Sequence, residues 1–336
     1  MSLRNHWYIA AESRQLKRRP MAAQPFGEHV VLFRTEEGTP AALADRCAHR
    51  NSALATGRIV ESCVECPYHG WRYNAQGVCI HIPALGCDAN LPNVIVKSFA
   101  CAEQQGYVWV CPGEPPPDTK PFSFPQLGQP GWTTFRMRTL FEGSVEACLE
   151  NFLDCPHTVF VHKGWFRSHD TRELTAIVRR RKNSAEVEFQ GEPISASVVS
   201  RLLFPKGREL RHTDQFLAPN ISRVDYDFGP DRHFIITSQC TPLNEKQTEV
   251  FTVITYRFGR IGPLVRLFFE PLSRRIIQQD VAILKAHSRQ LERFGGEQFC
   301  NVETDLLGLH IRALRARIER NELPLPEAAR EIKIRF

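Results

Sequence analysis

The stretch CAHRNSALATGRIVESCVECPYHG, residues 47–70, carries one cysteine and one histidine near each of its ends. The first pair is Cys47 with His49, and the second is Cys66 with His69. A structural zinc finger more often takes its cysteines as one pair and its histidines as another. Two mixed pairs suit a [2Fe-2S] cluster in which one iron binds both thiolates and the other binds both imidazoles, which is Rieske ligation. The stretch therefore predicts a Rieske cluster, and a zinc site stays open as the alternative.

A second candidate site lies further along the chain, in NFLDCPHTVFVH, residues 151–162. His157 and His162 are five residues apart, and Pro156 is expected to end or kink the preceding helix. Asp154 lies three residues before His157, so one helical turn would place both on the same face. Two histidines and one carboxylate bind Fe(II) and leave positions open for dioxygen and substrate. The alternative is a capping aspartate followed by two partly buried histidines.

A third iron ligand is sought on the predicted helix 273–293. Asp280 lies there between Ile277 and Leu284, which places it on the apolar stripe of the helix. An ionised carboxylate on that face costs several kcal/mol unless it is paired or bound to a metal. We therefore predict that Asp280 completes the site.

Two alternatives to this assignment stay open. Asp280 could be a buried carboxylate neutralised by Arg274 or Arg275 on the same helix. Asp305 is the reserve candidate for the ligand, although its neighbours look more like the start of a helix.

The domain organisation follows from a proline-rich break at 112–130, where seven of nineteen residues are proline. Such a stretch is read as an extended linker. Before it, the β-rich segments 29–34, 41–44 and 106–111 predict a small antiparallel β domain at 1–111. After it, Ser144 can cap a helix at 145–153. The further expected elements are strands at 174–178, 185–189, 233–238 and 248–258 and helices at 273–293 and 303–320. This order predicts an α+β domain at 131–336.

Composition excludes several classes of protein. The 336 residues contain no apolar run of the roughly 20 that a membrane helix requires, and residues 1–20 lack a secretory signal. Eleven cysteines, an odd number, favour thiols and metal ligands over disulfides. The net charge of +6 is lower than expected of a nucleic-acid-binding protein. The basic run 179–182 is interpreted as a solvated turn between strands. We expect a cytoplasmic protein without membrane or nucleic-acid partners.

The stretch 47–84 resembles the cluster-binding loops of Rieske non-haem iron oxygenase α subunits. The positions that match the family's pattern, besides the four cluster ligands, are Arg50, Leu54, Gly57, Pro67, Gly70, Trp71, Tyr73 and Gly77. Asn51 stands where the family usually has glycine, and this departure is not expected to cost a ligand.

Residues 151–162 resemble the mononuclear-iron motif of the same family. The resemblance implies that His157 and His162 are iron ligands. It also implies that Asp154 bridges His157 of its own chain to His69 of a neighbouring subunit. Asn151 matches an asparagine seen near the iron in the O-demethylase branch, and Gln279-Asp280 fits the family's carboxylate ligand on a late helix.

The resemblance implies a helix-grip (START-like) catalytic domain and the homotrimeric branch that includes vanillate and dicamba O-demethylases. The implied activity is that of the oxygenase component of a multicomponent monooxygenase. With O2 and NAD(P)H-derived electrons it would hydroxylate or oxidatively demethylate a small aromatic or polycyclic substrate. A separate ferredoxin or flavin reductase would supply the electrons, because the sequence has no flavin or dinucleotide fingerprint.

Two other functions stay open, namely a ring cis-dihydroxylating dioxygenase and a Rieske electron-transfer protein with a ligand-binding domain. Two segments bear on partners and substrate. On the predicted strand 234–242, Ser238 and Gln239 lie on opposite faces, so at most one of them can line a cavity. The arginines of the last helix (Arg312, Arg315, Arg317 and Arg320) are read as a solvated face, which an acidic ferredoxin could also use.

Overall fold

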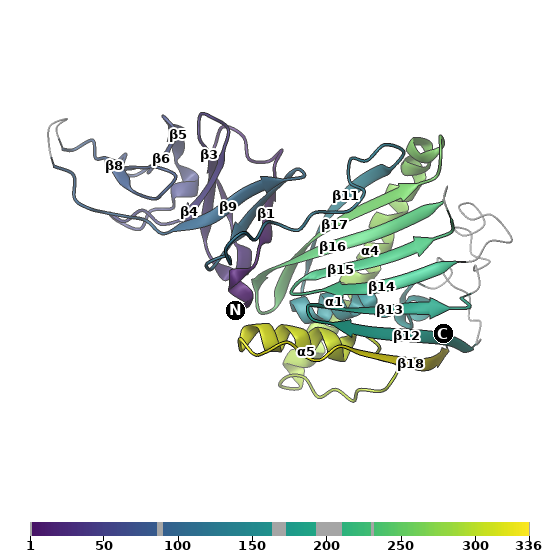
Figure 1. Ribbon diagram of the computed structural model, residues 1–336. Helices are drawn as coiled ribbons and strands as arrows, with labels where there is room; N and C mark the ends of the chain where they lie inside the picture. The colour runs from purple at the N-terminus through teal and green to yellow at the C-terminus, as the bar shows by residue number, and fades with distance from the viewer. Residues whose placement is uncertain (1, 86–89, 163–172, 193–209, 230–231, 336) are drawn as a thin grey trace. The chain divides into compact units, whose positions relative to one another are not determined.

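The chain forms two compact units, Ser2–Ser123 and Phe124–Phe336, each with its own core (Figure 1). The computed structural model describes residues 2–85, 90–162, 173–192, 210–229 and 232–335. The division between the units falls inside the range 112–130, for which the sequence predicts a linker.

The first unit is a β domain with two antiparallel sheets (Figure 1). The larger sheet has the order β1-β10-β9-β4-β3-β2 and the smaller one β5-β6-β7-β8. The strands of the larger sheet are β1 (Tyr8–Glu12), β2 (Met21–Ala23), β3 (Val30–Arg34), β4 (Pro40–Ala44), β9 (Ser98–Gln104) and β10 (Tyr107–Cys111). Those of the smaller sheet are β5 (Arg58–Val60), β6 (Cys63–Glu65), β7 (Arg72–Tyr73) and β8 (Cys79–His81). Short 3-10 turns lie at η1 (Leu3–Asn5), η2 (Pro25–Gly27) and η3 (Leu54–Thr56).

One glycine shows how closely the chain is packed around the smaller sheet. Gly77 turns the chain into β8 with a φ of +81°, which favours glycine. A Cβ at this position would lie 1.9 Å from the carbonyl oxygen of Val96. No side chain fits there, so the turn that carries β8 back toward the cluster loops requires glycine.

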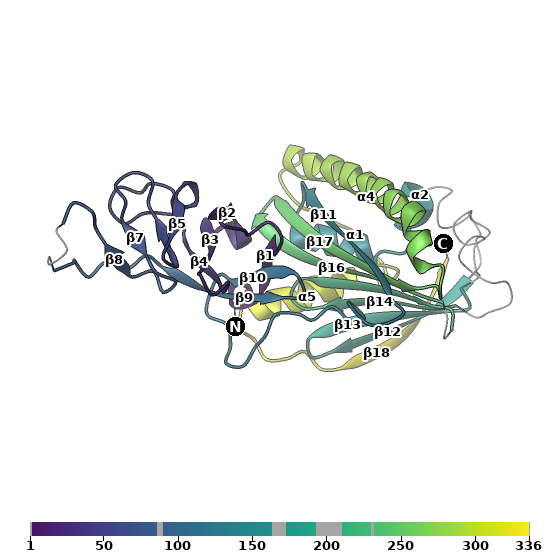
Figure 2. The same ribbon diagram turned by 90° about the horizontal axis from the view of Figure 1, so that it is seen from above.

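The second unit is an eight-stranded antiparallel sheet packed against helices (Figure 2). Its strand order is β11-β17-β16-β15-β14-β13-β12-β18. The strands are β11 (Thr133–Phe141), β12 (Glu173–Arg181), β13 (Ser184–Gln190), β14 (Arg211–Leu217), β15 (Ile221–Asp227), β16 (His233–Asn244), β17 (Gln247–Arg257) and β18 (Ala328–Arg335). The helices are α1 (Val145–Leu153), α2 (His157–Val161), α4 (Gly262–Arg293) and α5 (Gly308–Glu319).

The predicted α+β class is confirmed for this unit, with three differences. Helix α4 begins at Gly262 and not at 273. The sequence suggests the later start because a proline usually ends or kinks a helix, and Pro271 lies inside α4. Strand β18 follows the last helix and pairs with β12, whereas the sequence predicts no strand after the helix 303–320. The basic run 179–182 is also not a turn alone, since Arg179 to Arg181 belong to β12.

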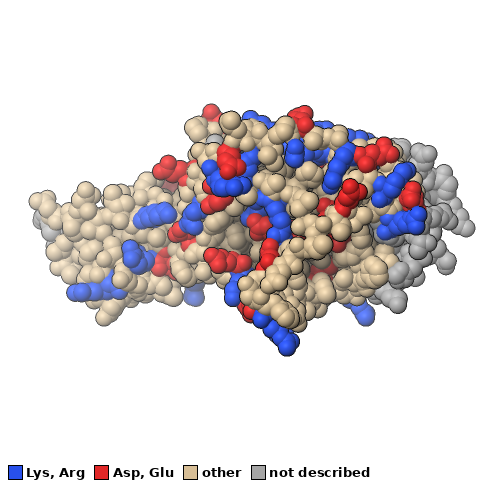
Figure 3. Space-filling model, turned by 90° about the horizontal axis from the view of Figure 1, so that it is seen from below, with Lys and Arg blue, Asp and Glu red and all other residues tan. Residues whose placement is uncertain are grey.

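Helices α1, α4 and α5 share one apolar core with the sheet, and this arrangement holds α1 and α4 close together. Figure 2 shows α4 running along the sheet. Among the described residues, no helix combines the length and the apolar composition needed to cross a lipid bilayer. Lysine and arginine alternate with acidic side chains over the face drawn in Figure 3, which agrees with the modest net charge.

Candidate metal centres

The first candidate centre lies in the loops after β4 and β6. Cys47 and Cys66 are buried, with 1% and 2% of their surface exposed. Burial raises the pKa of the Cys47 thiol, and the neighbouring Cys66 thiol adds to the rise. The rings of His49 and His69 form a separate pair with 4.5 Å between their centroids. The structure thus brings the two thiols together and the two imidazoles together.

This pairing separates a two-iron cluster from the zinc alternative. A tetrahedral zinc ion needs four ligand atoms that converge on one point. Among the described residues, two sets of three ligand atoms lie within 4.8 Å of one another, and neither set includes these cysteines and histidines. The buried Nδ1 of His49 has no hydrogen-bond partner among the described residues, so its lone pair is available to a metal. The residues fit a [2Fe-2S] cluster bound by thiolates at one iron and imidazoles at the other.

Aromatic residues of the same loops hold these ligands in place. Trp71 stacks on His49, with 4.7 Å between the ring centroids and 3° between the planes. The Tyr73 hydroxyl lies 3.2 Å from Sγ of Cys47 and accepts the Ala48 N–H at 3.2 Å. Its O–H can therefore donate to the Cys47 sulfur, and such hydrogen bonds tune the potential of a cluster.

Asn51 shows why the resembled family uses glycine at its position. Its φ is +59°, in the left-handed region, where asparagine is among the few non-glycine residues tolerated. Its N–H donates to the Cys47 carbonyl at 2.9 Å, so the loop closes as a glycine would close it.

The second candidate centre is built on α1, α2 and α4. The Ser144 side chain caps α1 by accepting the Ala147 N–H, and α1 ends at Leu153. After the break, α2 begins at His157, and His162 stands at its C-terminal end. Proline disfavours helical backbone in the residue before it, so Pro156 explains why the helix stops here.

Helix α4 brings Asp280 to these two histidines. Oδ1 of Asp280 lies 3.1 Å from Nε2 of His162 and 3.6 Å from Nε2 of His157, and the two Nε2 atoms are 3.4 Å apart. Asp280 is 5% exposed, and its buried Oδ1 has no hydrogen-bond partner among the described residues. A set of two imidazoles and one carboxylate fits Fe(II) of the facial-triad type.

Hydrogen bonds to the outer ring nitrogens leave both Nε2 lone pairs pointing inward. Nδ1 of His162 lies 2.9 Å from Oε1 of Gln279 and donates to it. Nδ1 of His157 donates to the main-chain carbonyl of Asp154. Outer partners of this kind orient metal-bound histidines. Burial raises the pKa of the Asp280 carboxyl, but the two imidazoles outweigh burial and hold that pKa below its usual value.

Arg274, considered as a partner of Asp280, and Asp305, considered as the ligand in its place, both make other contacts. Arg274 pairs with Glu270 at 2.8 Å and donates to the Arg136 carbonyl. Asp305 accepts the Val302 N–H at 2.9 Å, as expected of a residue at the start of a helical segment.

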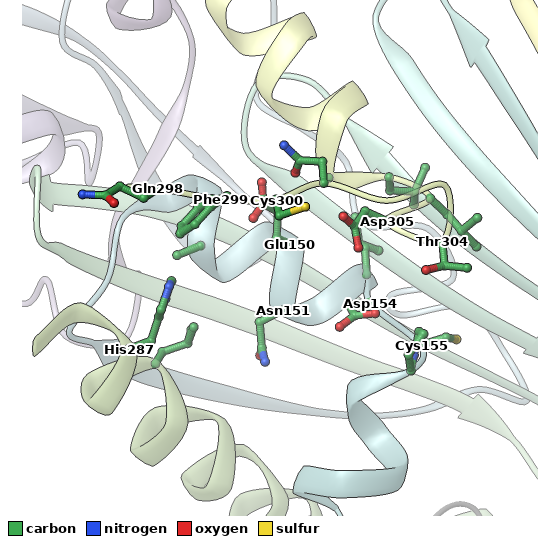
Figure 4. A pocket seen from close by; sticks show the side chains of 18 residues that line it. Glu150, Asn151, Asp154, Cys155, His287, Gln298, Phe299, Cys300, Thr304 and Asp305 are labelled. Carbon is green, nitrogen blue, oxygen red and sulfur yellow. The ribbon is translucent and has the colours of Figure 1, made fainter. Parts of the chain in front are cut away.

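Asp154 differs from its predicted geometry. It adopts extended backbone at the end of α1, so no shared helical face brings its side chain to His157. Its carboxylate lies 3.9 Å from Nδ1 of His157, and its carbonyl oxygen makes the hydrogen bond. The carboxylate opens on a cavity of about 460 Å³ beside Asp305 (Figure 4). Reduced hydration raises the pKa of Asp154, and the carboxylates of Asp305 and Asp214 add to the rise.

A buried ionic cluster around His212, which the sequence did not predict, lies beside the turn that carries Asp154. Nε2 of His212 lies 2.9 Å from Asp214, and Nδ1 lies 2.7 Å from Glu192. Burial lowers the pKa of His212, but the two carboxylates outweigh it and raise the pKa to about 9. The Cys155 thiol donates to Asp214 at 3.4 Å, so the cluster fastens the turn that carries Asp154 and His157.

The arginines of α5 are not a solvated face, and this expectation is wrong. Arg315 and Arg317 are both 5% exposed. Arg315 pairs with Glu146 of α1, and Arg312 reaches Glu150 of α1 at 2.5 Å. Helical periodicity showed the charges but not their partners on α1. Arg317 donates to the Lys182 carbonyl at 3.0 Å and Arg320 pairs with Glu322 at 3.1 Å, so all four arginines have partners within the unit.

A smaller cavity of about 140 Å³ lies against the second candidate centre. His157, His162 and Asp280 line it, as does Asn151 at the end of α1. Ser238 also lines it, whereas Gln239 is fully buried and bonds to Cys240 and Thr241.

Comparisons with known proteins assign both halves of the chain. Residues 6–100 match the Rieske [2Fe-2S] domain, and residues 141–321 match the vanillate O-demethylase oxygenase C-terminal domain. Chlorophyllide a oxygenase of Oryza sativa subsp. japonica is 27% identical over 97% of this chain and 59% of its own length. The putative toluene-4-sulfonate monooxygenase system iron-sulfur subunit of Comamonas testosteroni is 31% identical over 54% of this chain and 52% of its own length.

The chain thus spans less than two thirds of the length of these two relatives. Among solved structures, dicamba monooxygenase bound to dicamba superposes with a TM-score of 0.80 at 21% identity, over 95% of this chain and 98% of that one. This likeness confirms the fold, a Rieske β domain followed by a catalytic domain of mixed helices and sheet.

Proposed function

This chain belongs to the Rieske proteins with a vanillate O-demethylase oxygenase C-terminal domain, and we propose that it is the oxygenase component of a multicomponent monooxygenase. The observation that carries the proposal is the convergence of His157, His162 and Asp280 beside a cavity. An electron carrier has no use for such a set. The proposed domains are a Rieske domain at 1–111, a linker at 112–130 and a catalytic domain at 131–336.

Each chain would hold one [2Fe-2S] cluster and one Fe(II). Cys47, His49, Cys66 and His69 would hold the cluster, and His157, His162 and Asp280 would hold the iron. When bound, the cluster relays electrons and the iron activates dioxygen. The protein's part is to keep both Nε2 atoms deprotonated and directed inward, through Gln279 and the Asp154 carbonyl.

We propose that Asp154 links the two kinds of centre between subunits of a homotrimer. Its carboxylate would accept a hydrogen bond from His69 of the partner subunit. Two observations support this role: the Asp154 side chain is 47% exposed, and the cavity it faces, of about 460 Å³, is large enough to admit an imidazole ring. Its main-chain carbonyl already holds His157, so one residue would contact both ligands.

Asn151 would act from the substrate side. It lines both cavities, and its buried Oδ1 has no hydrogen-bond partner among the described residues. An amide oxygen in this position can accept a hydrogen bond from a bound molecule. We assign it to orienting the substrate next to the iron.

The reaction would be hydroxylation or oxidative demethylation of a small organic substrate with O2. Hydroxylation of a methyl group on oxygen or nitrogen gives a product that releases formaldehyde and leaves the demethylated compound. Ring cis-dihydroxylation is the alternative outcome at the same site. A ferredoxin or flavin reductase would deliver the electrons, and the proposed compartment is the cytoplasm.

Metal analysis of the purified chain tests the proposal. An oxygenase should contain about three irons and two acid-labile sulfides per chain, whereas a Rieske electron carrier should contain about two of each. Product analysis with methoxylated aromatics, N-methyl compounds and polycyclic alkaloids would then separate demethylation from hydroxylation. A preparation with full cluster content and no third iron would contradict the oxygenase assignment.

A further inference from the structure

We infer that a row of hydroxyls in the cavity beside the second metal centre binds the hydrogen-bonding group of a small, mostly apolar molecule. The inference rests on the proposed function and concerns the substrate class of that site. It follows from the order in which the sheet presents hydroxyl, aliphatic and aromatic side chains to the cavity.

Three hydroxyls form a row across three neighbouring strands of the cavity floor. Ser222 on β15 pairs in register with Ser238 on β16, which pairs with Thr252 on β17. All three line the cavity and are at most 3% exposed. The Ser238 and Thr252 hydroxyls lie 2.9 Å apart. One hydroxyl of that pair donates to the other, and the second O–H can turn toward a ligand.

The next rows of the same floor are apolar. Side chains two residues apart point to the same face of a strand. Val224, Ile236 and Ile254 therefore follow the hydroxyls, and Tyr226 and Phe234 come after them. The sheet thus changes from hydroxyl to aliphatic to aromatic along the length of the cavity.

The hydroxyl end of this gradient lies level with the metal centre. Phe269 of α4 packs on Tyr256 of β17 with 5.6 Å between ring centroids. Further along α4, Ser288 donates to the carbonyl of Glu142, and the hydroxyl of Thr248 on β17 donates to that of the adjacent Gly143. Helix α4 therefore runs antiparallel to β17.

Helix and strand spacing then place Asp280 along β17. It lies about 16 Å beyond Phe269 at the helical rise per residue. Thr252 lies about 14 Å from Tyr256 at the rise of a strand. The row of Thr252 is therefore the one nearest the level of Asp280, and a group held there lies next to the metal centre.

The size of the cavity limits the ligand. The volume of about 140 Å³ is close to that of a cavity of about 150 Å³ known to hold benzene, so one ring fits.

A binding measurement with two probes of one skeleton tests the inference. The probes are acetophenone and ethylbenzene, titrated into the iron-loaded protein with its cluster oxidised, at pH 7.5 and without reductant. We expect acetophenone to bind at least about 3-fold more tightly than ethylbenzene, because only acetophenone has an oxygen that can accept a hydrogen bond from the row. Ethylbenzene binding at least as tightly as acetophenone, or no binding of either probe at millimolar concentration, would overturn the inference.

Two substitutions locate the hydrogen bond. Ser238→Ala and Thr252→Val should each weaken acetophenone binding about 3- to 10-fold and leave ethylbenzene binding unchanged. Thr237→Val is the matched control, because Thr237 is buried on the opposite face of β16. Equal losses for both probes, or the same loss in the control, would contradict a role of the hydroxyl row.

The readout is independent of turnover. A protein that prefers acetophenone but forms no product with any substrate would count against the proposed oxygenase function alone. A protein that holds its third iron and turns over a substrate but binds ethylbenzene at least as tightly as acetophenone would count against this inference alone.

Discussion

The two candidate metal centres differ in how far apart in the sequence their residues lie. In the first, Cys47 and its partner Tyr73 are 26 residues apart, and all four ligands lie within residues 47–69. In the second, His162 contacts Gln279 across 117 residues. A change in the first should therefore act locally, whereas the second depends on how α1, α4 and the sheet pack together.

Loss of a cluster ligand is the largest expected effect and tests whether the first centre is independent. Cys66→Ala should abolish the visible absorption of the cluster and all turnover, because one iron loses a thiolate. The iron bound at the second centre should remain. The measurements are the absorption spectrum, the EPR spectrum of the reduced protein and the iron content.

Cys63→Ala is the matched control, since Cys63 is a buried cysteine of β6 whose thiol donates to the Glu61 carbonyl. A normal reduced Rieske EPR signal in Cys66→Ala would show that the cluster ligands are assigned wrongly.

Loss of Asp280 tests the second centre in the same way. Asp280→Ala should empty the mononuclear site and spare the cluster spectrum, because the two sites come from different segments. The loss of activity should exceed the roughly 100-fold effect of removing an outer partner of a ligand. Asp305→Asn should retain its iron, since its side chain bonds within its own segment. An Asp280→Ala protein with a stoichiometric third iron would move the carboxylate ligand elsewhere.

Asp154→Asn tests whether the two centres communicate. Both metals, the Rieske spectrum and the oligomer should be retained, while electron transfer to the second centre should fall about 10- to 100-fold. The amide oxygen can still accept the hydrogen bond from His69 of the partner subunit, but it lacks the negative charge that strengthens such a bond. Single-turnover experiments with pre-reduced protein measure the rate. Cluster oxidation at the unaltered rate, or an active monomer, would exclude the bridge.

The smallest expected effect concerns His212 in the buried ionic cluster, whose contribution to the stability of the protein depends on pH. The pKa of His212 is about 9 in the folded protein, above the usual value near 6.5, so folding favours its protonated form. This contribution, on the order of 3 kcal/mol, is complete below about pH 6.5 and is lost as the pH rises through about 9.

Denaturant unfolding at pH 7 and pH 9.5 measures this contribution. The loss of stability between the two values should be smaller in His212→Gln, which cannot carry the proton. An equal loss in both proteins would show that His212 does not titrate as described.

The same contrast explains what the sequence could predict. The cluster loops could be read directly because their ligands, turns and aromatic residues lie within one short stretch. Asp280 could be found because a carboxylate on an apolar stripe is costly. The start of α4 could not be predicted, because Pro271 indicates a helix end that the packed helix does not have. The partners of His212 and Arg315 were also missed, because Glu192 and Glu146 reach them only through tertiary packing.

The pairing of β18 with β12 also bears on how the chain folds during synthesis. Arg335 contacts Glu173 across 162 residues, so β12 leaves the ribosome long before its partner strand. Until then β12 is an unpaired edge strand with Leu174, Ala176 and Val178 on one face. Such edges invite pairing with other chains, and distant contacts form slowly. Slow or interrupted translation near residue 330 should therefore increase aggregation of the catalytic domain, while the first domain, already complete, folds undisturbed.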